Sequence, residues 1–256
     1  MSHEITTSEK LGKLPWSIAT NAANTIFVQF TYFGSAFVLF LDILNFSKPQ
    51  VGLLLSLLQF SSLVALVVAP WVARIGYKRV YIGAFGMRTL VTAGLLSIPW
   101  IIMSGSQTTF VFVAAIVALF AILRSIGITA FFPWAQEYVP NAIRGRFSAS
   151  NNLITSLVGL IAVAIAGTIL DQISGLNGYL VLFGAAVFFG MLALWTASRR
   201  PGGAPAPKDD PASRNIKDAI RDRDYIRYLA GAGLMTFAIV PLNSFVPLYL
   251  QEQVGI

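Results

Sequence analysis

Arg124 lies deep inside an apolar run, residues 108–136, and is the side chain best placed to do chemistry. It is about 15 residues from one end of the run and about 13 from the other, or roughly 20 Å by helical rise. A guanidinium has only donors and keeps its charge, which suits it to an anionic group. We therefore expect Arg124 to bind an anionic solute group or to answer a carboxylate. The alternative is an interhelical structural pair with carbonyls or with an amide such as Asn24 or Gln59.

A second set of polar side chains follows one face of the run 16–42. Their 3-4-3-4 spacing, which Val28 completes, is that of a helix face, and two further polar residues lie beside it. In a membrane an exposed amide is costly, so this face must meet protein or water. From the residues alone, this face lines a solute path or packs against another helix. The members are Asn21, Asn24, Thr31 and Ser35, flanked by Gln29 and Tyr32.

Other polar residues of the apolar runs receive structural interpretations. Arg88 is about 13 Å from Arg79 along a helix, close enough to extend its side chain to the membrane surface. Trp134 is expected to anchor its helix at the interface. The carboxylates of Asp42, Glu137 and Asp171 fall near the ends of the runs, so no proton carrier is evident near their middle.

Seven apolar runs of roughly 20 residues or more must position these side chains, since about 20 helical residues cross the hydrocarbon core. Runs such as FVFVAAIVALFAIL are apolar on every face and too long for barrel strands, so each is predicted to be a helix. The predicted spans are 16–42, 50–72, 80–103, 108–136, 147–171, 178–198 and 227–252.

The composition excludes several classes of protein. Only 11% of the 256 residues are charged, the mean hydropathy is +0.71, and a soluble domain normally has about 25% charged residues. The charge of +7 does not indicate nucleic-acid binding, because the basic residues flank the spans. A membrane enzyme or metal site is not expected, since His3 is the only histidine and cysteine is absent. The run 227–252 also lacks the lysine that a retinal protein needs.

The basic residues also indicate the orientation of the chain. With a cytoplasmic N-terminus, the inner segments hold fourteen Lys and Arg, whereas the outer segments hold only Lys48. The inner residues are Lys10, Lys13, Arg74, Lys78, Arg79, Arg144, Arg146, Arg199, Arg200, Lys208, Arg214, Lys217, Arg221 and Arg223.

The sequence after the sixth span changes to a linker rich in Pro, Gly and charge, residues 199–226. Its second half is open to two interpretations, a surface helix or a solvated linker. The next span then resembles the first, because SAFVLFL at 35–41 aligns with NSFVPLYL at 243–250 at an offset of 208. This pattern predicts a parallel duplication of six-helix halves. We therefore expect the chain to be part of a longer protein.

Two loops extend this pattern to a family resemblance. The loop between the second and third spans resembles the G-x-x-x-D-R-x-G-R-[RK] motif of the major facilitator superfamily of secondary transporters. Arg74, Gly76 and Lys78 match it, whereas Ala69, Ala73 and Tyr77 depart from it. Between the fourth and fifth spans, VPNAIRGRFSA is similar to the family's P-x-x-x-R-G-R loop through Pro140, Arg144, Gly145 and Arg146. The resemblance implies that the matching residues gate the cytoplasmic side.

The sequence thus predicts an all-α polytopic membrane bundle of about seven spans. Residues 1–198 form a six-helix half, 199–226 a cytoplasmic linker, and 227–256 the first helix of an incomplete second half. The resemblance implies transport of a small solute by alternating access, without a cofactor, in a bacterial inner (plasma) membrane. Coupling to protons or another ion is left open. The alternatives are a truncated chain that needs its missing C-terminal half for activity, or a seven-span membrane protein that is not a transporter.

Overall fold

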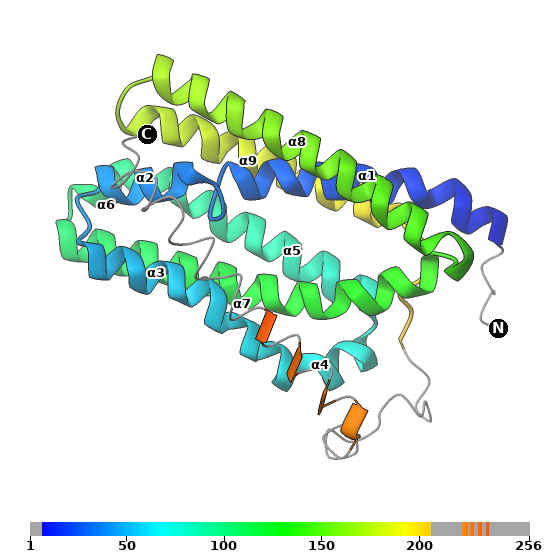
Figure 1. The fold of residues 1–256 in the computed structure, drawn as a ribbon. Coiled ribbons are helices and arrows are strands. Elements are labelled where there is room, and N and C mark those ends of the chain that lie inside the picture. The colour runs from blue at the N-terminus through cyan, green and yellow to red at the C-terminus, as the bar shows by residue number, and fades with distance from the viewer. Residues whose placement is uncertain (1–6, 206–221, 225, 228–229, 232–233, 236–256) are drawn as a thin grey trace. The chain divides into compact units, whose positions relative to one another are not determined.

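A computed structural model of the protein describes residues 7–205 and the short stretches 222–224, 226–227, 230–231 and 234–235 (Figure 1). The chain divides into two compact units, Met1–Pro207 and Lys208–Ile256. The described residues form helices and connecting turns without a strand, which confirms the all-α prediction. The repeat at 243–250, most of the predicted span 227–252 and residue His3 lie outside the described residues.

Five helical stretches of the described residues are long and apolar enough to cross a membrane, in agreement with five predicted spans. Two of them change to 3-10 geometry for a few residues within their length. The first is α3 (Lys48–Phe60), Ser61–Leu63 and α4 (Val64–Ile75); the second is α5 (Tyr77–Ala93), Gly94–Ser97 and α6 (Ile98–Ile102). The others are α7 (Ser106–Tyr138), Asn141–Ile143 leading into α8 (Arg144–Gln172), and α9 (Leu176–Ser198).

The predicted first span, 16–42, is not one continuous helix. It consists of α1 (Thr7–Gln29) and α2 (Ser35–Ile43), separated by a break at residues 30–34. A Cβ atom on Gly34 would lie 1.9 Å from the carbonyl oxygen of Gln29, so only glycine fits the sharp bend. The Thr31 hydroxyl donates to the Phe27 carbonyl at 2.7 Å, which satisfies a backbone group near the break. A single glycine in an apolar run did not reveal this interruption.

Within the first unit, α1 packs against α8 and α9, while α5 packs against α7 and α9 (Figure 1). Helix α5 approaches α7 closely at Gly127. A Cβ atom there would lie 2.2 Å from the Phe85 ring, so glycine lets that ring rest against the α7 backbone. The small residues Gly159, Ala162 and Ala166 are the buried residues of α8. Helix packing through small residues is typical of membrane bundles.

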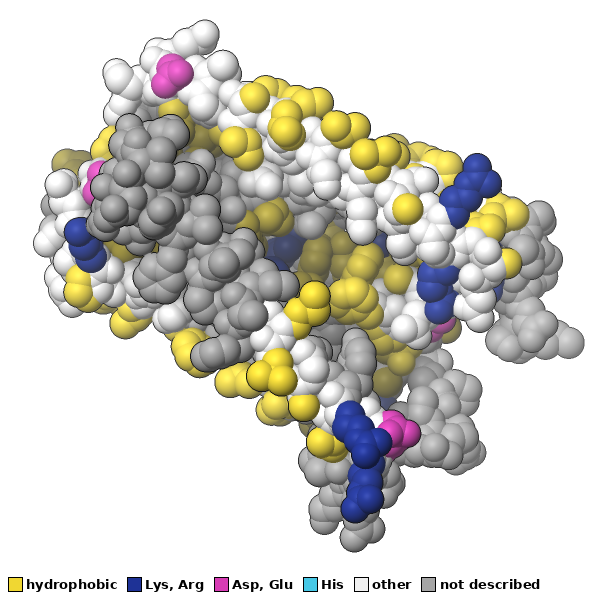
Figure 2. Space-filling model, in the orientation of Figure 1, with side chains coloured by type: hydrophobic (Ala, Val, Ile, Leu, Met, Phe, Trp, Pro, Cys, Tyr) yellow, Lys and Arg dark blue, Asp and Glu magenta, His cyan; other side chains and the backbone are white. Residues whose placement is uncertain are grey.

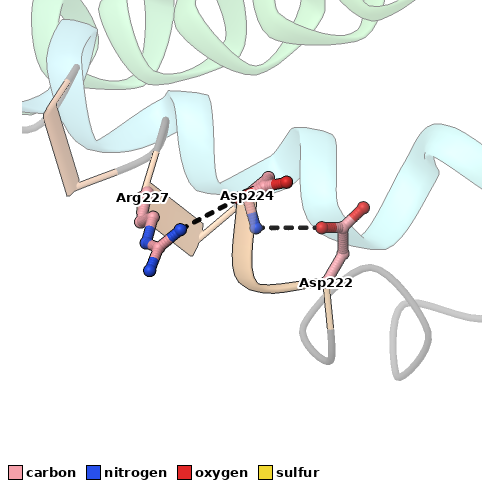
Figure 3. Close-up of polar contacts among 3 residues, drawn as sticks. All are labelled: Asp222, Asp224 and Arg227. Atoms are coloured by element: carbon pink, nitrogen blue, oxygen red, sulfur yellow. Dashed lines mark hydrogen bonds and ion pairs between the residues drawn. The ribbon is translucent and has the colours of Figure 1, made fainter.

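The described part of the second unit contains a local hydrogen-bonded turn (Figure 3). The Asp222 carboxylate accepts the backbone N–H of Asp224 at 3.0 Å, as an N-cap residue does at the start of a helix. Arg227 and Asp224 form an ion pair of 3.2 Å between exposed side chains. Such a pair contributes about 0–1 kcal/mol, so it adds little to stability.

Candidate functional site

One face of the first unit is hollowed between the side formed by α1 and α8 and the side formed by α7 (Figure 2). Hydrophobic and basic side chains lie deep in this hollow. The helices that pack behind it include α5 and α9 (Figure 1). A concave surface that combines apolar walls with a few polar groups is the usual form of a small-molecule site.

Arg124 projects from α7 and is half-buried. Its guanidinium carbon lies 4.6 Å from the centre of the Phe33 ring, and Phe33 belongs to the break between α1 and α2. Among the described residues, no hydrogen bond or ion pair is made by this guanidinium, and the alternative structural pair with Asn24 or Gln59 is not formed. The donors of Arg124 are therefore available to a ligand.

Arg88 does not extend to the membrane surface, and that prediction is wrong. Its side chain is only 2% exposed and lies inside the bundle. The guanidinium donates to the Asn24 side-chain oxygen and lies 3.6 Å from the Phe85 ring centre and 4.7 Å from that of Phe27. The physical reason is local compensation, because an amide oxygen and aromatic faces replace part of the lost hydration. Its Nε has no hydrogen-bond partner among the described residues.

The polar residues of α1 divide between two neighbours. Asn21 donates to the Asn151 side-chain oxygen of α8 at 2.8 Å, and Asn24 accepts from Arg88 of α5. Gln29 is half-buried, and its amide nitrogen lies 3.5 Å from the position that a Cβ on Gly159 would occupy. These three amides therefore lie where α1 meets α5 and α8.

The remaining members of the predicted stripe lie at the break. Thr31 is fully buried, and Tyr32 is 2% exposed, with its ring centre 3.8 Å from that of Phe120 and its hydroxyl 3.2 Å from that of Thr92. Ser35, by contrast, is exposed at the start of α2. The structure thus places Thr31 and Tyr32 in the packed core, whereas the three amides are only half-buried.

A second polar group, which we call the linker-end cluster, joins the residues that follow α9 to the ends of α5 and α7. The Lys78 ammonium group donates a hydrogen bond to the Arg200 carbonyl at 2.6 Å. The backbone N–H of Lys78 donates a second one to the Gly203 carbonyl at 3.2 Å. The Gly203 N–H donates to the Glu137 carboxylate at 2.6 Å. Gly76, with φ of +105°, is buried against Gly203, so the predicted loop residues Gly76 and Lys78 meet the start of the linker.

Arg200 is the central residue of the linker-end cluster, and sequence reasoning treated it only as a topology charge. It is 1% exposed. Its guanidinium donates to the Tyr138 hydroxyl at 3.4 Å, the Ser17 carbonyl at 3.4 Å and the Asn21 side-chain oxygen at 3.3 Å. No spacing in the sequence distinguishes it from its exposed neighbour Arg199.

Trp134 also belongs to the linker-end cluster, so its prediction as an interfacial anchor is wrong. The indole is fully buried and donates to the Pro201 carbonyl at 2.8 Å. Its ring centre lies 5.5 Å from the Arg200 guanidinium carbon. A nearby acceptor lets the indole enter the bundle, because its one polar group is satisfied there.

The other predicted loop residues lie outside the linker-end cluster. Arg144 donates to the carbonyls of Gln136 at 3.3 Å and Val139 at 3.4 Å, which caps the end of α7. Arg74, Gly145 and Arg146 are exposed. In the part of the chain that the structure describes, no group of His, Asp or Glu could hold a metal ion.

Comparison with known protein families matches residues 21–256 to the Major Facilitator Superfamily. No curated protein and no solved structure gives a significant match. The family match covers most of the chain, including the hollow, the two loops and the linker.

Proposed function

Because the chain belongs to the major facilitator superfamily, a family of secondary transporters and not of enzymes, we propose that it moves a small solute by alternating access. In such a mechanism a solute site opens to each side of the membrane in turn. The surface of the hollow between α1, α8 and α7 forms one wall of that site.

The observation that carries this proposal is that the Arg124 guanidinium lies within a membrane span without a hydrogen-bond or ion-pair partner among the described residues. A charged side chain deep in a membrane span costs about 2.5–3.5 kcal/mol even on insertion scales. No described group pairs with the Arg124 guanidinium, so nothing in the described bundle offsets that cost except the Phe33 ring. Solute and water in the hollow provide the missing compensation. The site then contains Arg124 with the amides Asn21, Asn24 and Gln29, and Ser35 at its edge.

The two cytoplasmic loops have a different role in this proposal. Residues Arg74, Gly76 and Lys78 of one loop and Arg144, Gly145 and Arg146 of the other control the inner opening as the bundles rock. The N-terminus lies in the cytoplasm of a bacterium, and the lipid of its inner membrane covers the apolar outer surface. The contacts of Lys78 with the linker support a role in this movement.

Counterflow in proteoliposomes tests the proposal with a panel of sugars, organic anions and drugs. We expect at least one solute to exchange, and Arg124→Ala to lower its rate about tenfold or more at equal protein insertion. Arg199→Ala is the matched control, because it removes the same charge from an exposed position. Exchange that is unchanged in Arg124→Ala, or absent for every solute with the wild-type chain, would refute the proposal.

A further inference from the structure

Two amides of α1 have the same unusual arrangement, since each side-chain oxygen faces a buried arginine. Arg88 donates to the Asn24 oxygen, and Arg200 donates to the Asn21 oxygen at 3.3 Å. A guanidinium has donors and no acceptor, so only the oxygen of an amide can face it favourably. The orientation of both amides is therefore fixed by chemistry.

This orientation turns each amide nitrogen away from its arginine. The nitrogen of Asn21 donates to Asn151 on α8 at 2.8 Å, so its donor capacity is partly used within the bundle. The side-chain nitrogen of Asn24 makes no hydrogen bond with any described residue. This side chain is also only half-buried, so its nitrogen can be reached by a ligand. Asn24 therefore offers free donors on α1, the helix that borders the hollow.

Close packing holds the Arg88 side chain in the position that orients the Asn24 amide. Its guanidinium lies over the Phe85 ring at 3.6 Å, and Gly127 lets that ring pack directly on α7. Gly127 is three residues after Arg124, on the neighbouring turn of the same helix face. The arrangement of Arg88 and Asn24 is thus tied by close packing to the part of α7 that carries Arg124.

The charges of the described helices select the kind of ligand that fits. Arg88 and Arg124 lie inside their spans, whereas the acids of the described spans lie near helix ends: Glu9 in α1, Asp42 in α2, Glu137 in α7 and Asp171 in α8. The region between α1 and α7 therefore has positive charge and donors without a described carboxylate. A ligand there must bring acceptor atoms and negative charge, since an uncompensated cation is costly in a membrane.

We propose that Arg88 is a positioning residue, which holds Asn24 so that its amide N–H groups and the Arg124 guanidinium bind an oxyanion. The solute is then an organic acid or a phosphate compound, bound through its anionic end. This inference rests on the proposed transport function and names the substrate class for the same site. Arg88 itself does not touch the solute, because it is buried beneath the aromatic rings.

Asn24→Asp provides a sharp test, because it keeps an oxygen for Arg88 and removes the N–H donors. The purified full chain is heated with sodium succinate, sodium phosphate, glucose or sodium chloride at matched ionic strength. We expect succinate or phosphate to protect the wild type. Asn24→Asp should melt no lower than the wild type without ligand, yet lose at least about tenfold in apparent affinity for that oxyanion.

Two further variants separate positioning from simple structural support. Arg88→Lys keeps a charged donor and should retain oxyanion protection better than Arg88→Met. Asn152→Asp changes an exposed amide of α8 in the same way and should bind as the wild type does. The proposal is overturned if no oxyanion protects the wild type, or if Asn24→Asp binds the oxyanion normally. A neutral solute that exchanges in proteoliposomes without oxyanion protection would leave the transport function standing and remove only this inference.

Discussion

Replacement of Arg200 by glutamine should destabilise the first unit, Met1–Pro207, although Arg200 lies beyond the last residue of α9. The guanidinium is 1% exposed and donates to three acceptors, on Ser17 and Asn21 of α1 and on Tyr138 of α7. Glutamine is shorter and has one amide, so it cannot reach all three acceptors. The substitution therefore removes hydrogen bonds from these oxygens, of which the Tyr138 hydroxyl keeps its contact with the Ser17 hydroxyl at 2.8 Å.

The magnitude follows from the number and quality of these contacts. A buried polar group that loses its partner costs about 1–3 kcal/mol. The three distances are 3.3–3.4 Å, which indicates weak bonds, so about 1 kcal/mol for each acceptor is appropriate. Removing a buried cation also relieves its desolvation, and that gain offsets part of the loss. We expect the free energy of unfolding to fall by about 2–3 kcal/mol.

The assay is reversible unfolding of the purified chain in mixed detergent micelles, with Arg199→Gln as the control. Arg199 is adjacent and exposed, so its substitution should change the free energy of unfolding by less than about 0.5 kcal/mol. Hydrogen exchange should also accelerate at the amides of Lys78 and Gly203, which bond within the linker-end cluster. If both variants unfold alike and these amides remain protected, the assigned role of Arg200 is incorrect.

Two further predictions concern helix packing and membrane orientation. Gly127→Ala should lower the unfolding free energy by about 1–3 kcal/mol, because its Cβ would meet the Phe85 ring at 2.2 Å, whereas Gly83→Ala, with open space, should be neutral or slightly stabilising. A drop no larger for Gly127→Ala would contradict the close contact. The natural chain lacks cysteine, so single cysteines at Gly145 and Ser104 should react with an impermeant thiol reagent from the cytoplasmic and outer sides, respectively; the reverse pattern would invert the topology.

The described spans agree with the predicted ones because the length of an apolar run is a local property of the sequence. Apolar length predicts a membrane helix without knowledge of its neighbours, and five spans were found close to their expected places. The break before α2 was missed, since it depends on how tightly the backbone folds at Gly34. The sequence predicted that Arg124 and the α1 amides lie in helices, but it did not predict that Asn21 contacts Asn151 or that Asn24 contacts Arg88.

The sequence by itself determined that the chain is a helical membrane protein of this family, because apolar length, loop charge and short motifs are properties of contiguous residues. Only the tertiary structure decided which arginines are buried. Arg88 looked able to reach water and Arg200 resembled Arg199, yet both lie inside the bundle. Their burial depends on helix rotation and on acceptors supplied by distant segments, such as Asn24 for Arg88 and Ser17 for Arg200. A partner from another helix offsets the cost of burying a charge, and the local sequence does not encode that partner.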